Sequence, residues 1–146
     1  MRNPQSLARL RDLSHYQEQL RSADLARALA EYRQANEQQR QLQQYLRDYQ
    51  QRYPTGSLAD LRNHREFILK LSRAIEEQNG VLARLEHRMK TCQQHWRISK
   101  KRHESVEQAY LDARQAMREA EEKALQKDLE THTARPSRDI FDNATD

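Results

Sequence analysis

The chain has 146 residues, with 26 Lys and Arg against 22 Asp and Glu, and only two glycines, three prolines and one cysteine. So few turn-forming residues exclude an ordinary globular fold, in which Gly alone makes up about 7% of residues. The single Cys92 excludes a disulfide scaffold. The other residues are mostly Ala, Leu, Gln, Arg and Glu, which favour helix, so the composition predicts an all-α protein with long helices.

The prolines mark where helices begin and end. Asn3 is a candidate N-cap in front of Pro4, whose missing N–H costs nothing at the first position of a helix. Pro54 interrupts the helical pattern, and Ser57 followed by Asp60 resembles a capping box. These signals predict two helices joined by a short turn.

The predicted helices cover 4–53 and 58–131, with a turn at 54–57. A connection this short makes the second, longer helix run antiparallel to the first. We therefore expect residues 1–131 to form one antiparallel coiled-coil hairpin, followed by a disordered polar tail over 132–146.

Apolar residues recur at alternating steps of three and four along the second predicted helix. Starting at Leu61, fifteen of twenty such seam positions are apolar and the register does not break. The first helix follows the same rule from Leu25 onward, whereas Leu10, Leu13 and Leu20 fit a frame displaced by one residue. A sustained 3.5-residue period predicts a left-handed coiled coil.

A tight turn would also fix which residues face each other. If residues 53 and 58 were opposite, Pro4 would lie beside Glu107. The stretch from Tyr110 to Glu130 would then have no partner within the chain, and we expect this overhang to fray, dimerise or enter another protein.

The sequence contains no pattern for catalysis. Gly56 and Gly80 stand alone, so there is no phosphate-binding loop, and a two-helix hairpin does not enclose a substrate pocket. Cys92 and His95 lie one turn apart and could supply half a metal site, but zinc requires three or four converging ligands. We expect no enzyme activity, no cofactor and no metal.

A wider apolar strip is predicted near the turn. Tyr45 and Phe67 each precede a seam position by one residue, and the pairing places them at nearly the same level. The strip is completed by Leu42, Tyr49, Leu71 and Ala74. Exposed aromatic residues of this kind indicate a protein interface; alternatively, they thicken the core beside the turn.

Positive charge is concentrated before residue 107, because the last 40 residues carry 6 basic and 10 acidic side chains. With the pairing above, a basic collar forms at the open end of the hairpin. Its members are Arg9, Arg11, Arg97, Lys100, Lys101 and Arg102. Such a collar could bind phosphates, bind an acidic protein surface or remain a solvated face. Interleaved acids and the absence of an aromatic platform argue against a nucleic-acid ligand.

These patterns together resemble the FliJ family of flagellar type III export proteins. The resemblance rests on Gln38, Leu42, Tyr45 and Tyr49, on the run from Phe67 to Ile75, and on Trp96 before a basic stretch. It implies a stalk, similar to that of rotary ATP synthases, that binds the pore of the hexameric export ATPase. It further implies that the stalk links the ATPase to the membrane export gate and can escort export chaperones.

The resemblance also implies a gate-binding surface. Carried over residue by residue, that surface consists of Gln38, Leu42, Tyr45, Tyr49, Phe67, Leu71, Ala74 and Gln78. Gln78 stands where the family has His. The basic collar would then belong to the end that enters the ATPase.

The sequence has neither a signal peptide nor an apolar stretch long enough to cross a bilayer, so we expect a cytoplasmic protein. The resemblance further implies a peripheral position at the inner membrane of the flagellar base. Two alternatives stay open. One is the equivalent stalk of a virulence type III secretion system, and the other is a basic scaffold or nucleic-acid-binding coiled coil.

Overall fold

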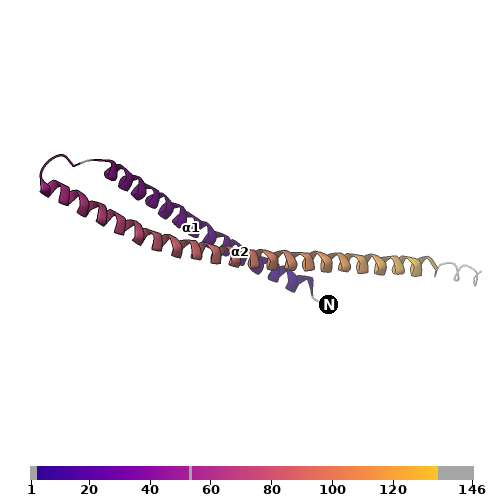
Figure 1. Ribbon diagram of the computed structural model, residues 1–146. Coiled ribbons are helices and arrows are strands. Elements are labelled where there is room, and N and C mark those ends of the chain that lie inside the picture. Colours follow the sequence, from indigo (N-terminus) through magenta and orange to yellow (C-terminus); the bar gives the residue numbers. More distant parts are fainter. Residues whose placement is uncertain (1–2, 53, 135–146) are drawn as a thin grey trace, which may run out of the picture. The chain divides into compact units, whose positions relative to one another are not determined.

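A computed structural model describes residues 3–52 and 54–134. It contains two α-helices, α1 (Pro4–Gln51) and the longer α2 (Leu58–Ala134), and no strand among the described residues (Figure 1). The predicted all-α hairpin with a longer second helix is confirmed. Residues 132–134, expected in the disordered tail, continue α2, and the rest of that expected tail lies outside the described residues.

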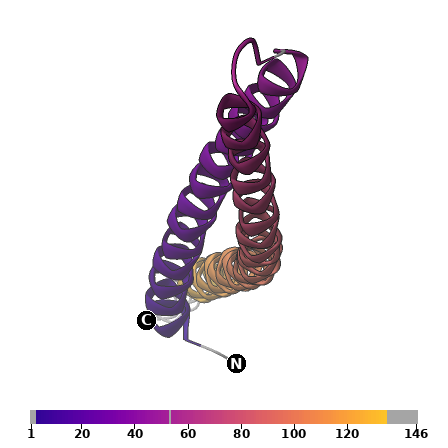
Figure 2. The same cartoon turned by 60° about the vertical axis from the view of Figure 1, so that its left-hand side comes forward.

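The chain divides into two compact units. The loop unit is Tyr16–Lys100, and the terminal unit combines Met1–His15 with Lys101–Asp146. In the loop unit α1 and α2 run antiparallel on either side of the loop that joins them (Figures 1 and 2). In the terminal unit the first turns of α1 pack against a later stretch of α2.

Both helices begin with the predicted side-chain caps. The backbone N–H of Gln5 donates to Oδ1 of Asn3 at 3.1 Å, which satisfies one of the free donors at the start of α1. The backbone N–H of Ser57 donates to the Asp60 carboxylate at 3.2 Å, and Gly56 takes the positive φ of 145° that the chain needs there. These local signals fix where each helix starts.

The seam of α2 follows the predicted 3.5-residue period. Every predicted seam position from His64 to Ala113 is at least partly buried, whereas Met117 is exposed. In the loop unit the most buried apolar side chains are Ala28, Ala35 and Leu71. Small residues at the contact bring the two helix backbones close together.

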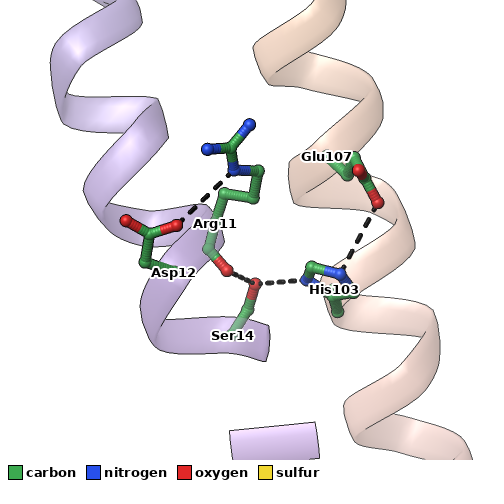
Figure 3. Close-up of polar contacts among 5 residues, drawn as sticks. All are labelled: Arg11, Asp12, Ser14, His103 and Glu107. Carbon is green, nitrogen blue, oxygen red and sulfur yellow. Dashed lines mark hydrogen bonds and ion pairs between the residues drawn. The ribbon is translucent and has the colours of Figure 1, made fainter. Parts of the chain in front are cut away.

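The predicted frame shift at the start of α1 is wrong. Leu7 and Ser14 are buried and Arg11 is partly buried, which continues the frame of the rest of α1, while Leu10 and Leu13 are exposed. The apolar pattern gave the wrong frame because the polar residues Arg11 and Ser14 occupy seam positions, where they contact Tyr110 and His103 of α2 (Figure 3 draws Ser14 and His103). A polar residue can occupy a seam position when its hydrogen-bonding groups are satisfied.

The pairing of the helices also differs from the tight-turn expectation. Arg11 lies with its guanidinium carbon 4.2 Å from the centre of the Tyr110 ring, about three helical turns beyond Lys100, its expected neighbour. Figure 1 shows the reason: α2 begins beyond the last turn of α1, so the helices do not start level with each other at the loop.

This register shortens the overhang. Pro4 and Leu7 line a shallow groove with Met117 and Ala120, instead of lying beside Glu107. Tyr110 and Ala113, expected to lack an intramolecular partner, are therefore partly buried in the terminal unit, whereas Met117 and Ala120 line the groove and remain exposed.

Candidate partner-binding site

Four rings from both helices form an aromatic cluster in the loop unit. Tyr49 of α1 lies 4.3 Å from Phe67 and 5.1 Å from His64 of α2, measured between ring centres. Tyr45, one turn earlier on α1, lies 6.4 Å from both Tyr49 and Phe67. These separations are typical of favourable aromatic pairs. The cluster therefore holds the two helices together near the loop.

The cluster is only partly covered. Tyr49 and His64 are partly buried in the seam, but Tyr45 is 58% exposed and Phe67 is 37% exposed. Tyr49 thus supports the rings that face solvent. A partner can cover apolar area on Tyr45 and Phe67 without the helices having to separate.

The other predicted site residues fall into three groups. Gln38 is exposed on α1, Leu42 and Ala74 are partly buried, and Leu71 is buried in the seam. Gln78 donates a hydrogen bond from Nε2 to the carbonyl oxygen of Ala35 at 3.0 Å. Leu71 and Gln78 therefore lie between the helices, whereas Tyr45, Phe67 and Gln38 are exposed to solvent.

Sequence reasoning missed two features beside this cluster. His64 was expected only as a seam residue, yet its ring stacks on Tyr49 at an interplanar angle of 17°. Leu58 and Leu61 are exposed because α2 begins beyond the end of α1. Both features depend on the helix register, which the periodic pattern does not specify.

The predicted basic collar rested on the tight-turn pairing, which is wrong. In the terminal unit Arg9, Lys101 and Arg102 are exposed, but Arg11 is partly buried and its Nε lies 3.6 Å from Asp12. The remaining two basic residues lie in the loop unit. Arg97 and Lys100 are exposed there, and the Lys100 ammonium lies 5.1 Å from the Trp96 ring centre.

The half metal site proposed from spacing gains no further ligand. Cys92 is partly buried, His95 is exposed, and in residues 3–52 and 54–134 neither belongs to a group of three or more possible ligands. Neither helix, over its described length, has an apolar stretch that could span a bilayer.

The fold and the aromatic cluster define an α-helical hairpin with exposed aromatic side chains from both helices. The family described as "Flagellar FliJ protein" matches residues 3–135. The chain therefore belongs to the FliJ family, and it is a flagellar export-related protein that interacts with other export components. Searches of curated proteins and of solved structures found no match.

Proposed function

We propose that this protein is a non-enzymatic stalk that links the hexameric flagellar export ATPase to the cytoplasmic domain of the membrane export gate. In this role it also escorts export chaperones, and it reaches the inner membrane only through its partners. Membership of the FliJ family supports a role in export. The particular partners are proposed from the surfaces described above.

The observation that carries the gate-binding role is the exposed part of the aromatic cluster. Tyr45 and Phe67 come from different helices, are supported by Tyr49 and remain accessible. A monomeric coiled coil needs apolar residues only along its seam. Aromatic side chains beside the seam are the residue types that dominate protein interfaces.

A matched pair of tyrosines on α1 tests this assignment. Tyr45 and Tyr16 are 58% and 59% exposed, so replacing either with Ala removes a similar area from solvent contact. Tyr45→Ala should weaken binding to the gate cytoplasmic domain by about 2 kcal/mol, the scale of an interface hot spot, and Tyr16→Ala should not. Isothermal titration calorimetry measures both. Equal affinities for the two variants would contradict a gate site at this cluster.

The proposed ATPase-binding end is the terminal unit, with Arg9, Lys101 and Arg102 as exposed basic residues. Adding the protein to the cognate export ATPase should raise both the hydrolysis rate and the hexamer fraction, saturating at one copy per hexamer. If neither quantity changes while circular dichroism shows a folded helix, the protein does not act on the ATPase.

A further inference from the structure

A basic surface lies on α2, on the side away from the aromatic cluster. Leu69 is 59% exposed, and it follows Phe67 by two residues, which turns it about 200° around the helix. Arg65 and Arg73 lie one turn before and one turn after Leu69, and both are exposed. Within residues 3–52 and 54–134 neither arginine has an ion pair. We call Arg65, Leu69 and Arg73 the arginine surface.

The end of α2 carries the same arrangement with the opposite charge. Leu125 is 66% exposed, and the exposed Glu121 and Asp128 lie one turn before and one turn after it. Every residue of α2 from Arg114 to Thr133 is exposed, so α1 does not cover this stretch. Neither carboxylate has an ion pair in the described part of the chain. We call Glu121, Leu125 and Asp128 the acidic surface.

The two surfaces are complementary to each other. Each has an exposed leucine at its centre and like charges one turn away on both sides. If two helices pack with Leu69 against Leu125, each arginine lies opposite a carboxylate, whichever way the helices run. The wider segments agree with this pairing. Residues 62–73 contain four basic and one acidic side chain, and residues 119–130 contain five acidic and two basic ones.

One chain cannot make this contact with itself. Leu69 and Leu125 belong to the same uninterrupted helix, which cannot fold back to bring them together. We propose that the arginine surface of one copy binds the acidic surface of a second copy, so that the protein self-associates. The contact joins two small, unlike surfaces, so it is weak and reversible. It leaves the aromatic cluster uncovered, and it does not rest on the partners proposed above.

Sedimentation equilibrium of the full-length protein tests whether self-association occurs. In about 0.1 M salt, the mean mass should rise with protein concentration above the 17.5 kDa of the monomer. It should return toward the monomer near 1 M salt, because the Debye length falls from about 10 Å to about 3 Å. A monomer at every concentration in the lower salt would overturn the proposal.

Charge reversal tests which surfaces meet. Arg65→Glu/Arg73→Glu and Glu121→Lys/Asp128→Lys each place like charges opposite one another, so each variant alone should self-associate roughly tenfold more weakly or worse. An equimolar mixture of the two variants should associate again, because opposite charges then face each other between unlike copies. Wild-type association of either variant alone, or a mixture that stays monomeric, would contradict the assignment.

A matched control separates this contact from an effect of net charge. Arg21→Glu/Arg33→Glu changes the net charge by the same amount as Arg65→Glu/Arg73→Glu, at exposed positions on α1. It should self-associate like the wild type. All of the replaced side chains are exposed, so every variant should keep the helical circular dichroism of the wild type. Equal losses in the control and in Arg65→Glu/Arg73→Glu would overturn the proposal.

Discussion

The rings of Tyr49 and Phe67 pack against each other across the hairpin in a tilted arrangement, with 4.3 Å between their ring centres and an interplanar angle of 36°. Tyr49 belongs to the seam and Phe67 lies beside it. The pair therefore joins the buried contact between the helices to the exposed surface. We therefore expect Tyr49 to contribute mainly to the stability of the hairpin, and the neighbouring Tyr45 to contribute mainly to partner binding.

We expect Tyr49→Ala to lower the free energy of unfolding by about 2 kcal/mol, because it removes a partly buried ring with two aromatic neighbours on α2. Tyr45→Ala should cost less than about 1 kcal/mol, since most of that ring is already in water. Urea denaturation followed by circular dichroism compares the two. A larger loss for Tyr45→Ala would place that ring in the core.

A second comparison tests the frame of α1 in the terminal unit. Leu7 is 3% exposed and Leu13 is 52% exposed. Leu7→Ala should therefore destabilise the protein by about 2–4 kcal/mol, and Leu13→Ala by less than about 1 kcal/mol. Thermal melting of both variants distinguishes the observed frame from the displaced one, in which Leu13 would be the costly residue.

Replacing the two glycines with alanine should change the free energy of unfolding in opposite directions. Gly56 has a φ of 145° and a Cβ there would collide with the Asp60 carboxylate, so Gly56→Ala should cost about 1 kcal/mol or more. Gly80 lies inside α2, and a Cβ there would approach no atom closer than 3.9 Å. Gly80→Ala should stabilise the protein by about 0.5–1 kcal/mol. Denaturation midpoints that shift in the same direction for both variants would contradict this account.

The sequence predicted the helices and the seam of α2 because both depend on local signals. Asn3 and Asp60 cap the helices by hydrogen bonds to residues two or three positions away. The 3.5-residue period is a property of a single helix of the coiled coil. Tyr45 and Phe67 were likewise recognised as lying beside the seam.

The register between the helices and the frame at the start of α1 could not be predicted in the same way. Register depends on how far α2 extends past α1 at the loop, which no residue pattern encodes. The frame depends on Arg11 and Ser14, whose partners Tyr110 and His103 lie about ninety to a hundred residues away. An apolar pattern assigns Leu13 rather than Ser14 to the buried seam. Ser14 is the buried residue, because hydrogen bonds satisfy its hydroxyl.

The central claim is that aromatic side chains from both helices bind the export gate. The most direct test measures the affinity of the gate cytoplasmic domain for Tyr45→Ala/Phe67→Ala and for the control Tyr16→Ala/Leu69→Ala, which removes exposed apolar side chains elsewhere in the loop unit. Calorimetry should show a loss of about thirtyfold or more for the first, equal to about 2 kcal/mol, with the control unchanged and both proteins still helical. Wild-type affinity in the first variant would contradict the claim.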